Sequence, residues 1–305
     1  MEKIKKYLKK LKFYWKDNKI IAVKFFFEII KCGVLKPYNL NKAKKEELMF
    51  QRAIFGKKEL IIEIPYNDQI KSKIILPTKD IGLTKDLILK GIREPTEVKL
   101  FIEEVKPDMN IIDIGANLGY YILLEGKLTK GKIYGIEPNP QSIEYLKKSI
   151  KLNNYKNVTL FNIGINDSKK ILPFYISKKW NWSRFDNPGE DIIETKNILT
   201  DNLDNMFGNK KIDLIRMDVE GYELNILKGA NKIIEKNPSL ILFLEFHGNM
   251  FNTAEKKEFV NWINKNNFLI RFLGKSGEKH KIKYKYLNPN KIINLNSAYC
   301  LVLKK

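Results

Sequence analysis

The 305-residue sequence is poor in cysteine and histidine, with two of each. Cys32 and Cys300 lie near opposite ends of the chain and have no metal-ligand spacing. A disulfide-stabilised scaffold and a Cys-x-x-Cys zinc or redox site are therefore excluded. Proteins that do without disulfides are typical of reducing compartments, so we expect a cytoplasmic protein.

Long hydrophobic runs are missing near the start of the chain. The longest one, Ile20–Cys32, has 13 residues and includes Lys24 and Glu28. A membrane span needs about 20 apolar residues. The first residues also lack the continuous apolar core and small-residue cleavage site of a secretory signal. We therefore expect neither a transmembrane segment nor a signal peptide.

Acidic residues are fewer than basic ones: the chain has 35 Asp and Glu and 56 Lys and Arg, which gives a formal net charge of +21. Residues 1–60 contain 17 basic and 6 acidic side chains, and residues 251–305 contain 12 and 3. Basic ends suit a polyanionic partner such as nucleic acid, anionic lipid or a phosphorylated glycan. The abundance of Lys, Ile and Asn along the whole chain favours a compositional bias instead, and both interpretations stay open.

Residues 1–50 are predicted to form a basic helical extension. Apolar residues recur at helical spacing over residues 3–16 with lysines around them, and residues 20–35 suit a second helix. The first helix either lies on the anionic inner face of a membrane or packs on its own domain. Residues 51–95 are predicted to be a small lead-in with two short strands, at 60–64 and 73–76.

Residues 96–305 have the pattern of an α/β domain in which strands alternate with helices. The strands are expected at residues 110–116, 132–137, 158–163, 213–219, 239–246, 268–273 and 298–303. Such alternation indicates a mostly parallel sheet with helices on both faces, closed by an antiparallel pair at one edge. The stretch 165–212 interrupts the pattern. We expect it to be an insertion over the open end of the sheet, either for specificity or as a cover for the sheet edge.

The expected strand ends carry residues that suggest a nucleoside site. Gly115 permits a sharp turn after the first strand, and Gly119 lets the next helix pack closely. Glu137 ends the second strand about 20 residues later, where an acid can accept hydrogen bonds from both ribose hydroxyls. Asn117 replaces the middle glycine of the G-x-G-x-x-G motif and would crowd a pyrophosphate, so S-adenosylmethionine fits better than NAD. The residues assigned to the cofactor site are Asp113, Gly115, Asn117, Gly119, Glu137, Pro138, Asn162, Gly164 and Glu94.

The sequence resembles the FkbM-type family of S-adenosylmethionine-dependent methyltransferases, which have a Rossmann-like fold. The resemblance rests on IDIGANLGYY at 112–121, EPNP at 137–140, DLIRMDVEG at 213–221 and LKGA at 227–230, and it covers about residues 93–248. It implies methyl transfer, most often to a hydroxyl of a sugar or a natural product. Arg216 stands where the family usually has Lys, and Tyr222 where it often has Ala, which puts the substrate rather than the class in doubt.

Methyl transfer to a hydroxyl needs a base near the methyl group. The candidates at the ends of the fourth and fifth strands are Asp218, Glu220, Glu245 and His247. Asp218 best matches the family motif, and His247 has the suitable unperturbed pKa. Asp218 would otherwise hold the methionine end of the cofactor. Coordination of Mg²⁺ by Asp218, Glu220 and Glu245 is the less favoured interpretation, and Glu220 as a helix cap or His247 as a structural residue are the plainer ones.

Three functions therefore compete. The favoured one is an O-methyltransferase acting on a sugar, glycan, glycolipid or related small molecule. The second is an RNA methyltransferase whose basic ends contact phosphates. The third is a non-catalytic cofactor-binding protein of the same fold, since a fold does not fix a function.

Deletion of residues 1–18 tests the role of the first predicted helix. We expect the truncated protein to keep cofactor binding, because the nucleoside site is formed by residues 113–164. It should lose affinity for anionic vesicles, because seven of the lysines are then removed together with the apolar face. Vesicle flotation measures this directly. Equal flotation of the truncated and full-length proteins would rule out membrane contact by this helix.

Overall fold

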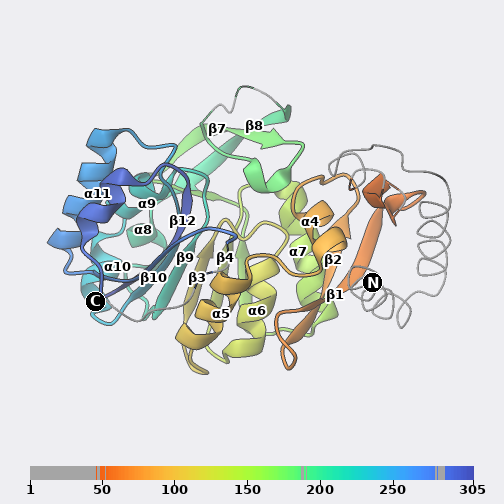
Figure 1. Cartoon of the computed structure of the whole chain (residues 1–305), viewed down its shortest axis with the longest axis horizontal. Coiled ribbons are helices and arrows are strands. Elements are labelled where there is room, and N and C mark those ends of the chain that lie inside the picture. The colour runs from red at the N-terminus through yellow and green to blue at the C-terminus, as the bar shows by residue number, and fades with distance from the viewer. Residues whose placement is uncertain are drawn as a thin grey trace. The chain divides into compact units, whose positions relative to one another are not determined.

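A seven-stranded sheet organises the structure (Figure 1). Its strands are β3 (Ile111–Ile114), β4 (Ile133–Ile136), β5 (Val158–Phe161), β9 (Leu214–Met217), β10 (Ile241–His247), β11 (Leu269–Lys275) and β12 (Ala298–Lys304). They are arranged in the order β11-β12-β10-β9-β3-β4-β5. The five strands from β10 to β5 are parallel, and β12 is inserted antiparallel between β10 and β11. This is the Rossmann-like sheet with an antiparallel last strand that the sequence predicts.

The computed structural model describes residues 46, 49–51, 53–186, 189, 191–278, 280 and 286–305. The chain divides into two compact units, Met1–Gly56 and Lys57–Lys305. The helices predicted over residues 3–16 and 20–35, and nearly all of the predicted 1–50 extension, lie outside the described residues. Among the residues that are described, no helix has the length and hydrophobicity to span a bilayer.

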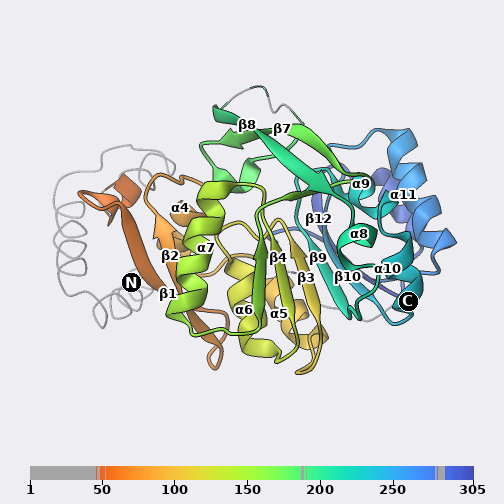
Figure 2. The ribbon, with the colours of Figure 1, turned by 180° about the vertical axis from the view of Figure 1, so that it is seen from behind.

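Helices cover both faces of the sheet (Figures 1 and 2). On one face lie α5 (Pro95–Glu104) and α6 (Tyr120–Leu128), and Phe101 of α5 packs edge-on against Phe243 of β10 with ring centroids 5.1 Å apart. On the other face, α8 (Leu203–Phe207) and α10 (Asn231–Lys236) pack with α9 (Glu223–Lys228) and α11 (Thr253–Lys265) over the main hydrophobic core. Alternate strand residues therefore face different layers: Ile215 belongs to that core, whereas its neighbour Arg216 faces α6.

The alternating pattern predicts one helix between the strands at 213–219 and 239–246, but the structure has two, α9 and α10. The break falls at Gly229, whose carbonyl oxygen accepts a hydrogen bond from the backbone N–H of Asp204 at 3.0 Å. The Asp204 carboxylate also accepts from the backbone N–H groups of Lys232 and Ile233, at 3.0 and 2.9 Å. It thus caps the start of α10, as acids do at helix N-termini. The boundary between α9 and α10 is therefore set by Asp204, which belongs to neither helix.

The predicted strands of the lead-in form an antiparallel hairpin, β1 (Glu59–Pro65) and β2 (Lys71–Pro77). The hairpin packs on the main sheet's helices, because the backbone N–H of Ile75 donates to Ser149 Oγ of α7 (Pro140–Leu152) at 3.0 Å. The helix α4 (Leu83–Lys90) that follows was not predicted. Its buried Leu83, Leu87 and Ile88 have helical spacing, so the signal was present but short.

The stretch 165–212 is a small sheet followed by a helix of the main core. The sheet consists of β6 (Gly164–Ile165), β8 (Ile192–Asp201) and β7 (Lys170–Ser177), with a 3-10 turn at Trp180–Trp182. Asp80 anchors this turn by accepting a hydrogen bond from the backbone N–H of Trp180 at 3.0 Å. The last part forms α8, whose Leu203 and Phe207 are buried in the main core. The element above the sheet is therefore shorter than the predicted insertion.

Gly115 forms the turn after β3 with a φ of +82°, and a Cβ there would lie 2.0 Å from the backbone oxygen of Asp218. Gly91 has nearly the same φ, +79°, but a Cβ there meets nothing within 4 Å. We expect Gly115→Ala to lower the free energy of unfolding by about 1–3 kcal/mol more than Gly91→Ala, because only the first change adds a clash to the same backbone strain. Equal losses in urea unfolding would contradict the close packing of this turn.

Candidate active site

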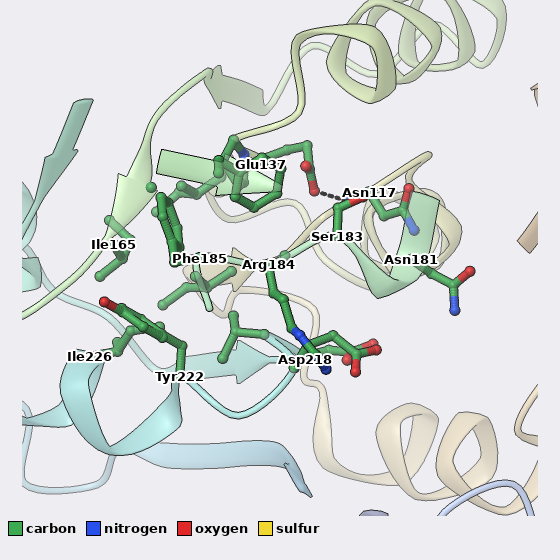
Figure 3. A pocket seen from close by; sticks show the side chains of 18 of the residues that line it. Asn117, Glu137, Ile165, Asn181, Ser183, Arg184, Phe185, Asp218, Tyr222 and Ile226 are labelled. Carbon is green, nitrogen blue, oxygen red and sulfur yellow. Dashed lines mark hydrogen bonds between the residues drawn. The ribbon is translucent and has the colours of Figure 1, made fainter. Parts of the chain in front are cut away.

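An open cavity lies at the carboxyl ends of the parallel strands. The strand ends contribute Gly115, Asn117, Glu137, Pro138, Asp218 and Glu220 to its wall. The small sheet and its 3-10 turn contribute Phe174, Trp180, Asn181, Ser183, Arg184 and Phe185. Figure 3 shows Arg184 extending from this sheet toward Asp218. The structure thus brings the predicted turn, the predicted ribose acid and two of the predicted catalytic acids to one cavity.

Glu137 is held in place by the loops on either side of it. Its Oε2 accepts from the backbone N–H of Asn117 and its Oε1 from that of Asn139, both at 2.7 Å. Asn162 does not line the cavity. Its side-chain amide donates to the carbonyl oxygens of Glu137 and Pro138, at 2.8 and 3.0 Å. Asn162 therefore holds the backbone of the Glu137 loop and does not face the cavity.

Burial raises the pKa of Glu137 to about 7, although the two backbone N–H groups oppose the shift. Glu137 as a whole residue is only 6% exposed. Hydroxyl groups that donate hydrogen bonds to its remaining lone pairs favour the ionised form. The affinity for any ligand that donates hydrogen bonds to this carboxylate is therefore coupled to the ionisation of Glu137 near neutral pH.

Asp113 lies beneath the cavity and does not line it. Its side chain is fully buried, and its Oδ1 accepts a hydrogen bond from Arg216 Nη1 at 2.8 Å. Arg216 Nη2 donates to Asp218 Oδ2 at 3.1 Å, and its guanidinium stacks 3.8 Å from the ring centroid of Tyr121. Asp113 was expected to face the cofactor, but in this structure it reaches the cavity only through Arg216 and Asp218.

Asp218, Glu220 and His247 converge, with one ligand atom from each lying within 4.8 Å of the other two. His247 ends β10, whereas Asp218 and Glu220 follow β9, its parallel neighbour. His247 Nδ1 lies 2.9 Å from Oε1 of Glu223, which is fully buried. His247 Nε2 lies 3.5 Å from Glu220 Oε2. The strand phase predicts the meeting of Asp218 and His247, whereas Glu223 is not among the predicted site residues.

The charges of this cluster shift its pKa values in opposite directions. Burial raises the pKa of Asp218, but Arg216, His247 and Arg93 outweigh it, so the net pKa lies below 3.8. Burial raises the pKa of Glu220 to about 7. Burial lowers the pKa of His247, yet its bond to Glu223 and the neighbouring acids raise it well above 6.5. Asp218 is thus ionised at neutral pH, while a protonated His247 cannot accept a proton without first losing one.

Glu94 and Glu245, two further predicted site residues, line a second and smaller cavity together with Arg216 and Cys300. Glu94 precedes α5 and bonds to Arg93 Nε at 2.6 Å and to the Tyr121 hydroxyl at 3.0 Å. Burial and the charges of Asp218 and Glu94 raise the pKa of Glu245 well above 4.5. Neither acid lines the main cavity, so the expected direct contact of both with cofactor or acceptor is not supported by their placement.

The main cavity fits S-adenosylmethionine in its chemistry. The turn at Gly115 leaves no room for a side chain, and Asn117, with a φ of +47°, presents its backbone N–H to Glu137 instead of to a phosphate. Gly119 has a φ of +94°, and a Cβ there would lie 2.3 Å from Leu146 of α7. Gly164 lines the cavity opposite the turn. These positions suit a nucleoside with an uncharged linker.

Comparison with known families identifies the domain. The family profile described as "Methyltransferase FkbM domain" matches residues 113–275, more than half of the chain. The chain belongs to the FkbM methyltransferase family. This membership confirms the resemblance found in the sequence, and with it S-adenosylmethionine as the cofactor.

Curated relatives of this FkbM-family chain are distant. The 2-O-methyltransferase NoeI of Sinorhizobium fredii is 28% identical over 48% of this chain and 70% of its own length. The hexuronic acid methyltransferase AglP of Haloferax volcanii is 25% identical over 47% of this chain and 58% of its own length. A protein-L-isoaspartate O-methyltransferase of Pyrococcus horikoshii is 30% identical, but the chain spans only 33% of it.

Solved structures match at still lower identity. An FkbM methyltransferase from Methylobacillus flagellatus is 16% identical with a TM-score of 0.41, over 68% of this chain and 51% of its own. TYW2 of Pyrococcus horikoshii, solved in complex with MeSAdo, is 15% identical with a TM-score of 0.46, over 81% and 71% of the two chains.

The FkbM-family site contains residues that sequence reasoning missed. Tyr121 lies in the recognised motif but was not assigned a role, and its ring covers the Arg216 guanidinium. Glu223 follows the acidic motif by one helical turn, which was a usable signal for a group facing the same side. Phe185 packs against Gly164 and lines the cavity, but it comes from an irregular segment with no periodic signal.

The pKa of Glu137 predicts how cofactor affinity changes with pH. Because the ionised form accepts the ribose hydrogen bonds, the affinity for S-adenosylhomocysteine should rise with pH up to about 7 and then level off. Below pH 7 this affinity should change by close to tenfold per pH unit. In Glu137→Gln the affinity should be weaker, and the part of its pH dependence that comes from this carboxyl should be absent. Calorimetric titration between pH 5.5 and pH 8.5 (roughly the range spanned by this pKa) measures it. The same pH dependence in both proteins would contradict the assignment of Glu137.

Proposed function

We propose that this protein is an S-adenosylmethionine-dependent O-methyltransferase that acts on a hydroxyl of a sugar or a related small molecule. One observation carries the proposal: the ionised Asp218 lines the same cavity as Gly115 and Glu137. The proton acceptor and the nucleoside site thus share one space. This is the arrangement that direct methyl transfer to a hydroxyl requires.

When bound, S-adenosylmethionine supplies a methyl group on a sulfonium, whose leaving group is neutral. The chain's residues therefore have mainly to hold two molecules in line and to accept a proton. We assign ribose binding to Glu137 and proton acceptance to Asp218. Arg216 fixes one carboxylate oxygen of Asp218 at 3.1 Å. Protonated His247 contributes positive charge near the acid instead of serving as the base.

The small sheet above the cavity is assigned to acceptor binding. Arg184 is the basic residue among those that line the cavity, and Trp182 beside it is 48% exposed. Lys179 lies over the Trp182 ring, 3.3 Å from its centroid. Donors and an exposed aromatic ring suit a polyhydroxylated acceptor. The names of the relatives NoeI and AglP, which specify a 2-O-methyltransferase and a hexuronic acid methyltransferase, support a sugar acceptor.

Identification of the acceptor comes first. Glycans and metabolites of deletion cells should include a species lighter than its wild-type counterpart by one methylene unit. Purified protein should restore the missing group with S-adenosylmethionine as donor. Transfer to RNA but not to any hydroxylated small molecule would contradict the proposal.

With that acceptor, Asp218→Asn tests catalysis. We expect kcat to fall about 10²–10⁴-fold, the usual contribution of a general base, because the amide cannot accept the proton. The Kd for S-adenosylhomocysteine should change little, since the lost interaction matters mainly in the transition state. Asp108→Asn is the matched control, because it makes the same change at an exposed aspartate that does not line the cavity. Turnover near the wild-type value would place the acceptor elsewhere, with Glu94 and the segment Trp180–Arg184 as the next candidates.

A further inference from the structure

The cluster of Asp218, Glu220 and His247 has the dimensions of a metal site. Their ligand atoms lie within 4.8 Å of one another. Bonds from oxygen or nitrogen ligands to divalent ions measure about 2.0–2.6 Å, so two ligands of one ion are at most about 5 Å apart. Two carboxylates and a neutral imidazole form a donor set that first-row divalent metals accept, so binding of the ion would displace the proton from His247 Nε2.

The orientation of His247 is the second observation. Its Nδ1 is fixed by the fully buried carboxylate of Glu223 at 2.9 Å. Its Nε2 is directed at the two acids, but it lies 3.5 Å from Glu220 Oε2, which is longer than an ordinary N–H···O hydrogen bond. A histidine that uses one ring nitrogen on a buried carboxylate and presents the other to a cluster of acids has the arrangement found around metal-ligating histidines.

Charge balance points the same way. The carboxyl groups joined through this network outnumber the basic side chains that serve them. The acids are Asp113, Asp218, Glu220, Glu223 and Glu245, and the basic groups that act on them are Arg216, His247, Arg93 and Arg184. Arg216 divides its two bonds between Asp113 and Asp218, at 2.8 and 3.1 Å. Buried carboxylates need a compensating charge, which a divalent ion supplies in one step.

We propose that Asp218, Glu220 and His247 bind a divalent first-row metal ion such as Mn²⁺, with Glu223 positioning His247 for it. The predicted alternative set contained Glu245, but the geometry substitutes His247. Because Asp218 and Glu220 also line the main cavity, the ion would face the acceptor. The inference rests on the proposed function in one respect: an ion there would lower the pKa of a bound hydroxyl. Asp218 would remain the group that accepts the proton lost by that hydroxyl.

Electron paramagnetic resonance with Mn²⁺ tests the site on the full chain without cofactor or acceptor. We expect one bound Mn²⁺ per chain and a pulsed-resonance coupling to an imidazole nitrogen. His247→Gln should abolish that coupling. His280→Gln is the matched control, because it removes the only other histidine, whose Nε2 lies 2.8 Å from the carbonyl oxygen of Lys275. It should leave the Mn²⁺ signal unchanged.

Glu223→Gln separates positioning from coordination. It should weaken Mn²⁺ binding by about 10–100-fold, the usual effect of losing a group that orients a metal ligand, while the nitrogen coupling of the remaining bound ion persists. Binding of S-adenosylhomocysteine by each variant checks that it is folded. Wild-type protein that binds S-adenosylhomocysteine but no Mn²⁺, or that keeps full Mn²⁺ affinity and imidazole coupling in His247→Gln, would overturn the metal site.

These outcomes are distinguishable from failure of the proposed function. If the protein transfers methyl groups at an unchanged rate in the presence of a chelator, the proposed function stands and the metal site is contradicted. If it binds Mn²⁺ at His247 but transfers no methyl group to any hydroxyl, the metal site stands and the proposed function is contradicted.

Discussion

The buried Arg216 guanidinium is the interaction on which the rest of the active site depends. It joins Asp113 of β3 to Asp218 at the end of β9, and the ring of Tyr121 covers it. Removing one member of such a buried pair typically costs about 3–5 kcal/mol, because the remaining charge is left without a partner. Folding of the central strands therefore fixes the carboxylate that faces the cavity. A Lys in place of Arg216 would supply a point charge but not the two divergent N–H groups that hold two acids at once.

The same constraint explains why the acids of the site behave so differently. Asp218 shares a cation and stays ionised, whereas Glu245, deeper in the sheet and beside Asp218, has a pKa raised by burial. His247 is held by Glu223 and faces Glu220. Because the acids of this group outnumber its basic side chains, the end of the sheet stabilises positive charge. That property serves a methyl donor with a sulfonium, and it also underlies the proposed metal site.

The fold was largely predictable because its signals are local and repeated. Buried strands such as Ile241–His247 contain a continuous apolar run, here Ile241–Leu244. Helices such as Thr253–Lys265 begin at a capping box, here formed by Asn252 and Glu255. The failures were of another kind. The helix Leu83–Lys90 is too short to show more than one apolar repeat, and the break at Gly229 is caused by Asp204, a residue outside the helix. Periodicity cannot report a cap that arrives from elsewhere in the chain.

The sequence by itself determined the sheet, the Gly115 turn and the position of Glu137 after the second strand, because chain spacing and strand phase alone place them at one edge. It also determined that Asp218 and His247 would meet, since they end neighbouring strands. Only the tertiary structure decided which acids face the cavity. It placed Asp113 and Glu245 in the interior, assigned Asn162 to the loop behind Glu137 and recruited Glu223 to His247. The physical reason is that a side chain's charge and direction depend on neighbours that the chain brings together only when it folds.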